Sequence, residues 1–387
     1  MNDRKERTLV VTRSLQIGGA ERHAISLANG FAEIGCDSYL VVLKKRKGLR
    51  PLPEVKVIDF NVDWLNRLTG IGLLYDLISR ATLAWMVPKS GFVWRGLYSS
   101  LYLRLLLKRI ERQSGPVDRV FFVGQGAFEN FWRWQDPRGR LLLVSPIQAG
   151  KPGLLQRFYT RLLYANRHLI VNSLGVKRSL EGWLQQCAVN SGQLELVYNP
   201  IDIGEISRLA MEAIEPPAAE YLVHVARLTY QKNQTLLLRA YALSGVTTPL
   251  VIVGDGQELP QLQRLATELD IAQRVHFIGN RSNPYPWMKQ ARLFILSSLQ
   301  EGFGLVIAES LCCGTPVVAT DSPGGVREVL IEEQQQFIAA MTPQSLAEAI
   351  VRALASPLEI KPHWFQRFDH RKIASTLLTG VEVRHDA

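Results

Sequence analysis

The sequence predicts an α/β protein with two doubly wound, Rossmann-like domains, each built on a parallel sheet. Short apolar runs of strand length alternate with longer amphipathic stretches of helical period in both halves of the chain. The alternation is interrupted at Asn199-Pro200, where the proline disfavours a helical conformation for the residue before it, and then it restarts. A domain boundary is therefore expected between residues 198 and 199.

Charge divides the chain at the same place. Residues 1–200 hold 29 Lys and Arg against 15 Asp and Glu, a net charge of +14, whereas residues 201–387 hold 16 against 20, a net charge of −4. A one-sided positive field attracts phospholipid headgroups, polyphosphate acceptors or nucleic acid. The alternative is that these charges only solubilise the first half.

Length and composition exclude several classes of protein. A chain of 387 residues with 47% hydrophobic content can bury two cores and is not disordered. Charges up to Arg7 and a short apolar run interrupted by Arg13 do not form a secretory signal, so a cytoplasmic protein is expected. No metal or redox centre is predicted, because zinc or redox spacing is lacking among Cys36, Cys187, Cys312 and Cys313.

The first half carries the pattern of a parallel sheet with ligand loops. The helix after the first strand opens on Gly18 and Gly19, which allow a donor phosphate or an acceptor to approach the backbone; a plain tight turn is the alternative. Loops 124–126 and 145–150 also follow strands, at the edge where open parallel sheets bind ligands. The strands are predicted at residues 9–12, 38–43, 117–123, 141–144, 168–173 and 193–197.

Residues 64–112 combine aromatic, apolar and basic side chains. Asp76 and Arg80 interrupt the longest apolar run before it could span a bilayer. A helix whose face carries Tyr98, Leu101, Tyr102 and Leu105 beside Arg and Lys suits the headgroup region of a membrane. The same stripe could pack on the sheet instead, and the basic loop at residues 44–50 could likewise contact anionic lipid or only water.

The second half repeats the strand and helix alternation. Arg227 and Lys232 flank the turn between a strand and a helix, so both cations can converge on one polyanion. The turn at Gly254 and Gly256 begins like a dinucleotide fingerprint, but Leu259 occupies the third glycine position, which argues against NAD. Strands are predicted at residues 221–226, 251–253, 275–279, 293–297 and 315–320, and helices at residues 234–241, 305–313, 343–355 and 364–378.

A strand, glycine turn and helix meet in residues 297–328. Gly302 and Gly304 open the turn, so a ligand can reach the backbone N–H groups at the helix N-terminus, where the helix dipole favours anions. Glu301 lies in this turn, and Glu309 lies a turn and a half into the helix. The pattern indicates a phosphate-bearing ligand bound by backbone, with two carboxylates available for hydroxyl groups.

This stretch also carries a family resemblance. Residues 301–305 (EGFGL), 308–310 (AES) and 314–320 (GTPVVAT) resemble the E-x7-E signature of the retaining, family-four (group 1) glycosyltransferases of the GT-B fold, of the type that builds bacterial cell-envelope polysaccharide and lipopolysaccharide. The resemblance implies an acceptor-binding domain at residues 1–198 and a donor-binding domain at 199–361, facing a cleft. It also implies a C-terminal helix at 362–387 that crosses back to the first domain.

The resemblance implies roles for single residues. Arg227 and Lys232 contact the diphosphate of the donor, Glu301 its sugar hydroxyls and Glu309 the ribose, while catalysis involves Glu301, Arg227 and Lys232. The other donor-binding residues are Gly18, Gly19, Gly302, Phe303, Gly304 and Leu305. Many family members carry a histidine in the loop that matches residues 145–150. Here Ser145 and Gln148 are the acceptor candidates, although glutamine cannot act as a general base.

The predicted function is transfer of a sugar, with retention, from a nucleotide diphosphate donor to a lipid-linked or lipopolysaccharide acceptor. The resemblance favours a UDP-sugar as the donor, and the sequence has no Asp-x-Asp stretch, so a metal-independent reaction with no cofactor and no nucleic acid partner is expected. A peripheral position on the inner face of the cytoplasmic membrane would suit the basic, aromatic first half. The alternatives are another sugar-nucleotide enzyme such as an epimerase, a glycosidase, or a non-catalytic membrane- or polyanion-binding protein.

Overall fold

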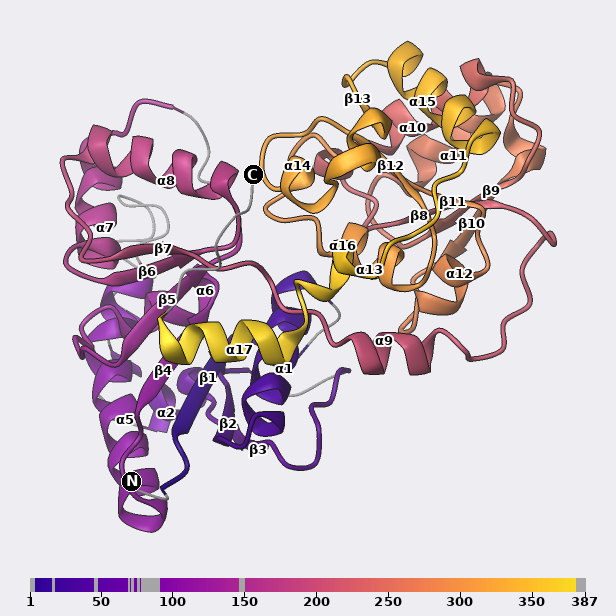
Figure 1. The fold of residues 1–387 in the computed structure, drawn as a ribbon. Coiled ribbons are helices and arrows are strands. Elements are labelled where there is room, and N and C mark those ends of the chain that lie inside the picture. The colour runs from indigo at the N-terminus through magenta and orange to yellow at the C-terminus, as the bar shows by residue number, and fades with distance from the viewer. Residues whose placement is uncertain are drawn as a thin grey trace. The chain divides into compact units, whose positions relative to one another are not determined.

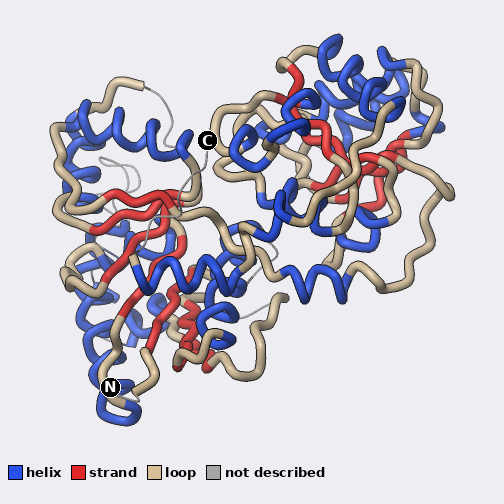
Figure 2. Tube along the Cα trace, viewed as in Figure 1, coloured by secondary structure: helices blue, strands red, loops and turns tan. Residues whose placement is uncertain are grey.

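The computed structural model describes residues 4–15, 18–44, 48–68, 91–145 and 150–380, together with residues 70, 73, 74 and 77. The chain divides into two compact units. Unit 1 comprises residues 1–172, 176–200 and 370–387, and unit 2 comprises residues 173–175 and 201–369. Each unit is an α/β layered structure, in which helices cover a parallel sheet, as the sequence predicts (Figure 1, Figure 2).

Unit 1 is built on a seven-stranded parallel sheet with the order β3-β2-β1-β4-β5-β6-β7. Its strands are β1 (Arg7–Thr12), β2 (Asp37–Val42), β3 (Lys56–Asp59), β4 (Arg119–Val123), β5 (Gly139–Leu143), β6 (His168–Val171) and β7 (Leu194–Leu196). The strands predicted from the sequence are confirmed to within two residues at either end. The prediction lacked β3, since this edge strand is partly exposed and has no apolar run.

Helices cover both faces of this sheet. Consecutive residues of a strand point to opposite faces, and Phe121 of β4 stacks on Phe31 at a ring distance of 5.0 Å, while Phe122 packs against Phe128, Phe131 and Trp134 on the other face. The helices of unit 1 are α1 (Gly19–Glu33), α2 (Val62–Leu68), α5 (Gly91–Ser114), α6 (Gln125–Phe128), α7 (Leu154–Tyr164), α8 (Leu174–Cys187) and α17 (His370–Thr379), with a short 3-10 turn at Glu129–Phe131.

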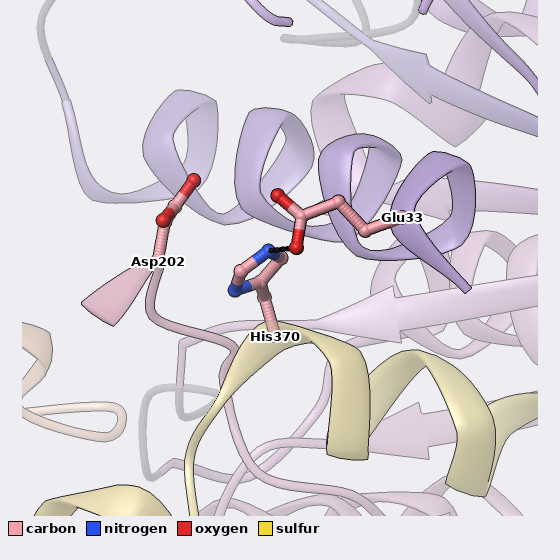
Figure 3. Close-up of side chains that lie close together, drawn as sticks. All are labelled: Glu33, Asp202 and His370. Atoms are coloured by element: carbon pink, nitrogen blue, oxygen red, sulfur yellow. Dashed lines mark ion pairs between the residues drawn. The ribbon is translucent and has the colours of Figure 1, made fainter. Parts of the chain in front are cut away.

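The helix α17 lies against α1 in unit 1 (Figure 1). A side chain at Gly30 of α1 could not be accommodated, because a Cβ there would lie 2.4 Å from the carbonyl oxygen of His370. Figure 3 shows the imidazole of His370 pointing at Glu33, with 3.1 Å between Nε2 and Oε2. At the other end of α17, Arg119 donates a hydrogen bond to the carbonyl of Leu378 at 2.6 Å. These contacts attach the last helix to the first sheet.

Unit 2 is built on a six-stranded parallel sheet with the order β10-β9-β8-β11-β12-β13. The strands are β8 (Leu222–Val225), β9 (Leu250–Val253), β10 (Val275–Gly279), β11 (Leu293–Leu296), β12 (Val317–Thr320) and β13 (Ile338–Ala339). The helices are α9 (Ile203–Leu209), α10 (Gln234–Ser244), α11 (Leu259–Glu268), α12 (Tyr285–Lys289), α13 (Leu305–Cys312), α14 (Val326–Val329), α15 (Pro343–Ala355) and α16 (His363–Gln366).

The core of unit 2 lies between the sheet and three helices. Leu222, Ile252 and Ile295 of the central strands pack with the apolar faces of α10, α11 and α15. The strands and long helices predicted here are confirmed to within three residues. The segment 364–378, however, is not one helix: it breaks at residues 367–369 into α16 and α17, which belong to different units.

None of the helices in the described part of the chain combines the length and the apolar character needed to cross a membrane.

Candidate active site

The candidate donor residues lie at the switch point of the sheet in unit 2. The strands β8 and β11 are neighbours at the centre of the sheet, and the chain leaves them toward opposite sides, to β9 and to β12. Arg227 follows the carboxyl end of β8, and Glu301 follows that of β11. Because both strands are parallel, the two loops start at one edge of the sheet, where open α/β sheets bind their ligands.

A buried hydrogen-bond relay holds the backbone at Arg227. The side-chain amide of Gln234 donates to the Arg227 carbonyl oxygen at 3.0 Å and lies 3.1 Å from Nε2 of His224. His224 Nδ1 lies 2.8 Å from the carbonyl oxygen of Ile295. The relay is satisfied when Nδ1 carries the proton and Nε2 accepts, and burial lowers the pKa of His224 to about 4, so the ring is neutral at neutral pH. The Arg227 guanidinium itself is exposed.

Lys232 and Glu301 form an ion pair across the two loops. Lys232 Nζ lies 2.5 Å from Oε1 of Glu301, and the Ser298 hydroxyl donates to the same oxygen at 2.7 Å. Their side chains are 20% and 11% exposed, so the pair is shielded from water and from salt more than a surface pair would be. Within the described part of the chain, Oε2 of Glu301 accepts no hydrogen bond and is available to a ligand.

The glycine turn before α13 opens the helix N-terminus. Gly304 caps the helix with a positive φ of 91°, and no side chain caps the first turn, which begins at Leu305. Phe303 is buried, and its ring lies 5.0 Å from that of Phe368 in a T-shaped contact, which holds the turn in place. Uncapped N–H groups at a helix N-terminus suit an anion. The glycine turn and the helix start at Leu305 are found where the sequence predicts them, while donor binding by residues 302–305 stays a prediction.

Glu309 lies inside α13 and is buried. Its carboxylate accepts a hydrogen bond from the hydroxyl of Tyr285 at 3.1 Å, and its side chain has only 7% residual exposure. A buried carboxylate needs hydrogen-bond donors. Tyr285 supplies one and leaves further acceptor positions on Glu309 for hydroxyl groups.

Glycines allow close backbone contacts at this edge of the sheet. Glu301 forms an isolated parallel bridge with Gly324, where φ is +131° and a Cβ would lie 1.4 Å from the Glu301 carbonyl oxygen. A Cβ at Gly254 or Gly256 would lie about 2 Å from the carbonyl oxygens of Ala226 or Leu228, at 1.9 and 2.2 Å. The Gly254 turn therefore packs closely against the Arg227 loop.

The candidate residues of unit 1 are placed only in part. Gly18 is the N-cap of α1 in extended backbone, Gly19 begins the helix, and the Ser14 hydroxyl donates to Glu21 of its first turn at 2.9 Å. Ser145 is exposed after the carboxyl end of β5. Gln148 lies outside the described residues.

The family of the chain follows from comparison with known proteins. The family model described as "Glycosyl transferases group 1" matches residues 211–367, which include every candidate residue of unit 2. The lipopolysaccharide core biosynthesis glycosyltransferase LpsE of Rhizobium meliloti is 30% identical over 313 residues, 79% of this chain and 77% of that relative. The chain belongs to the group 1 glycosyltransferases.

Further similarities of this glycosyltransferase extend to other relatives and to solved structures. One relative, from Campylobacter jejuni, is an N-acetylgalactosaminyltransferase whose name specifies a diphospho-undecaprenol-linked sugar. It is 36% identical over 182 residues, 47% of this chain and 49% of that relative. The chain thus spans about half the length of that relative in the match.

Two solved structures share the fold. Anabaena HepE in complex with UDP has a TM-score of 0.64 and 19% identity, with 97% of this chain and 99% of that chain covered. The lipopolysaccharide glycosyltransferase WaaG has a TM-score of 0.59 and 16% identity, with 96% and 95% covered. The fold class is therefore GT-B, with two Rossmann-like domains, as the sequence predicts.

Four residues of the site in this glycosyltransferase are missing from the sequence-based prediction: Ser298, Tyr285, His224 and Gln234. Ser298 lies three residues before Glu301, and Gln234 follows Lys232 at the start of a helix, so proximity in sequence could have suggested both. His224 occurs inside an apolar strand, where a buried polar residue is itself a signal. Tyr285 comes from a separate helix, and no spacing links it to Glu309.

Proposed function

We propose that this glycosyltransferase moves a sugar from a nucleotide diphosphate donor to a lipid-linked or lipopolysaccharide acceptor, with retention at the anomeric carbon and without a metal ion. The observation that carries the proposal is the grouping of Arg227, the Lys232–Glu301 pair and the open N-terminus of α13 at one edge of one sheet. The known structure of Anabaena HepE with UDP supports a UDP-sugar as the donor.

The proposed chemistry follows from the charge that the reaction creates. Breaking the bond between the sugar and the diphosphate builds negative charge on the leaving group. Arg227, Lys232 and the N–H groups that begin at Leu305 stabilise that charge more in the transition state than in the bound donor. The N–H groups of α13 and the backbone at Arg227 are fixed before the donor binds, so they need little reorganisation during the reaction.

The carboxylates of Glu301 and Glu309 accept hydrogen bonds from hydroxyl groups of the donor. Oε1 of Glu301 is engaged by Lys232 and Ser298, which fixes the side chain and leaves Oε2 to accept from a sugar hydroxyl. Glu309, held by Tyr285, is assigned to the ribose. In this scheme no protein group acts as a nucleophile, so departure of the diphosphate and attack of the acceptor occur on one face of the sugar, which gives retention.

The acceptor class rests on relatives. The name of the Campylobacter jejuni relative specifies a sugar on diphospho-undecaprenol, and that of LpsE specifies the lipopolysaccharide core. Both acceptors are amphiphilic and anionic. The basic unit 1 is complementary to such molecules in charge.

A donor screen tests the proposal. A panel of nucleotide sugars is incubated with lipid extract, and release of nucleoside diphosphate is measured. Arg227→Ala should reduce turnover at least a hundredfold, the effect of removing one preorganised charge-stabilising group. Arg239→Ala, an exposed arginine on α10, is the matched control and should retain wild-type turnover. No diphosphate release across the panel, or equal rates in both variants, would contradict the proposal and favour a non-catalytic protein.

Unit 1 also presents apolar side chains beside cations, which supports a peripheral membrane position. On α5, Leu101 and Leu105 are 51% and 62% exposed beside Arg104 and Lys108, while Leu103 and Leu107 of the same helix are buried in the core. The two alternatives for this helix are thus compatible: one face packs on the sheet and another stays exposed. Tyr102, expected on the exposed face, packs partly against the core.

The helix α7 has the same character. Leu154 and Phe158 are 86% and 54% exposed, and Arg157 and Arg161 lie between and after them. Apolar side chains insert at the headgroup level of a bilayer while adjacent Arg and Lys contact anionic lipid.

Flotation with liposomes tests this position. We expect the protein to float with anionic liposomes and to stay behind with neutral ones, and expect the change of Leu154 and Phe158 to Ser to weaken flotation severalfold. Leu243→Ser removes an exposed leucine of α10 in unit 2 and serves as the control. Indifference to lipid charge would rule out the anionic surface as a partner.

A further inference from the structure

A cavity of about 450 Å³ lies in unit 1 at the amino-terminal ends of its strands. Gly139 and Arg140 begin β5, His168 begins β6, and Gln193 directly precedes β7. In a parallel sheet these positions share the edge opposite to the one that carries Gly18, Gly19 and Ser145. The cavity is therefore separate from the loops of unit 1 assigned to the donor and the acceptor, and a ligand in it does not depend on the proposed function.

Two arginines line this cavity without a carboxylate partner in the described part of the chain. Arg140 donates to the carbonyl oxygens of Pro137 and Gly139 at 2.6 and 3.1 Å. Arg167 donates to the carbonyl oxygens of Trp132 and Trp134. Carbonyl dipoles fix both guanidinium groups in place but do not neutralise them.

Arg167 is held against an aromatic ring, and its charge has no carboxylate partner among the described residues. Its guanidinium lies over the ring of Phe128, with 4.6 Å between Cζ and the ring centroid, and its buried Nε has no hydrogen-bond partner among the described residues. Burial lowers the pKa of Arg167 to about 10. Burial and then repulsion from Arg119 lower the pKa of Arg140. A guanidinium charge without an ion-pair partner at the wall of a cavity is unfavourable unless a ligand compensates it.

The acidic groups around the cavity are already engaged. Asp136 accepts from Arg138 at 2.7 Å, and Glu195 lies 3.0 Å from Nε2 of His168. Neither lies within ion-pair distance of Arg140 or Arg167, although the charge of Glu195 opposes the lowering of the Arg140 pKa by burial and by Arg119. Among the residues that line the cavity, Arg140 and Arg167 outnumber the single carboxylate, Asp136, which Arg138 already neutralises.

The inner wall of the cavity is aromatic. Phe122, Phe128 and Trp134 line it and are almost fully buried. A volume of about 450 Å³ lies within the range of roughly 300–1,000 Å³ typical of small-molecule sites. This volume admits a ring-sized body, and two fixed guanidinium groups suit a doubly charged oxyanion.

The geometry points to this cavity as a binding site for a phosphate monoester that carries a ring-sized body. The phosphate dianion matches the two unpaired guanidinium groups in charge, and its oxygens match the planar donor fork of arginine. A carboxylate would neutralise only one of the two charges, so it should bind more weakly.

Calorimetric titration of the full chain with phenyl phosphate tests the site. The titration is run without UDP and again with UDP at saturation, which occupies any nucleotide site. We expect one site per chain, with benzoate at least tenfold weaker and phenol not detectable. Absence of heat from phenyl phosphate up to about 10 mM, or its displacement by UDP, would overturn the assignment.

Variants locate the binding. Arg140→Gln should weaken phenyl phosphate at least tenfold, about 1.4 kcal/mol in binding free energy. Gln193→Trp fills the exposed rim without removing a charge and should also abolish binding. Arg133→Gln removes an exposed arginine outside the cavity and should bind as wild type. Wild-type affinity in both Arg140→Gln and Gln193→Trp would contradict the site, whether or not sugar transfer is later observed.

Discussion

The free energy of unfolding of unit 2 should depend on pH because His224 is buried in its neutral form. Burial lowers the pKa of this residue to about 4, against an ordinary value of 6.5. The unfolded chain therefore binds a proton between about pH 6.5 and pH 4 that the folded chain does not bind. The folded pKa is the lower one, so stability falls as the pH drops through this window and levels off below it. Between about pH 7.5 and pH 5 the loss is about 2 kcal/mol, at roughly 1.4 kcal/mol per pH unit below the unfolded pKa.

The substitution His224→Asn isolates this contribution. Asparagine does not titrate, so the variant lacks the loss, although it costs stability at neutral pH because Gln234 loses its acceptor. We expect the free-energy difference between wild type and variant to shrink by about 2 kcal/mol between about pH 7.5 and pH 5. His23 of α1 is buried too, with its pKa lowered to about 4, so the comparison with the variant is needed to remove its contribution.

Hydrogen exchange under urea measures the stability of unit 2 alone. Peptides that cover β8 and β11 report the opening of this unit, which avoids the assumption that both units unfold together. His23→Asn should leave the pH dependence of these peptides unchanged. A wild-type to His224→Asn difference that stays constant with pH would refute the argument, because it would mean that the imidazole takes up its proton equally in both states.

Four further predictions concern the site. Gln234→Met should lower turnover at least tenfold with a smaller effect on KM, since the Arg227 carbonyl oxygen loses its hydrogen-bond donor. An unchanged turnover would show that Gln234 does not position Arg227. Glu301→Gln should reduce turnover at least tenfold while the protein stays folded by circular dichroism. Gly324→Ala should destabilise unit 2 by about 3 kcal/mol in the same exchange measurement because its Cβ would meet the Glu301 backbone, against about 1 kcal/mol for Gly245→Ala, which has open space around it. Treatment with EDTA should leave the rate within a factor of about two, and restoration of a lost rate by Mg²⁺ would contradict metal independence.

Much of the fold could be predicted because its signals are local. Buried parallel strands appear as short apolar runs, and α13 appears as a helix that begins after a glycine turn. Elements without such a signal were not predicted. These are β3, which is partly exposed at the sheet edge, and β13, which has two residues. The break between α16 and α17 was not predicted either, because the helical spacing of apolar residues continues across it.

The candidate site could be predicted at the level of which loops form it. The rule that ligands bind at the carboxyl ends of parallel strands places the Arg227 and Glu301 loops together, although 74 positions separate the two residues. It does not predict which atoms meet. The sequence suggested that Arg227 and Lys232 act as a pair of cations, whereas Lys232 is already paired with Glu301 and Arg227 is exposed.

This pairing bears on how the proposed reaction would proceed. An unpaired ammonium as buried as that of Lys232 would be costly, and Glu301 compensates it while no donor is present. As charge develops on the leaving diphosphate, the phosphate oxygens become stronger competitors for the same ammonium. Ser298 still donates to Oε1 of Glu301, so that carboxylate keeps one donor while Lys232 shifts its hydrogen bonding. In the proposed reaction, Lys232 would therefore interact more strongly with the diphosphate in the transition state than in the bound donor, which is the condition for lowering the barrier.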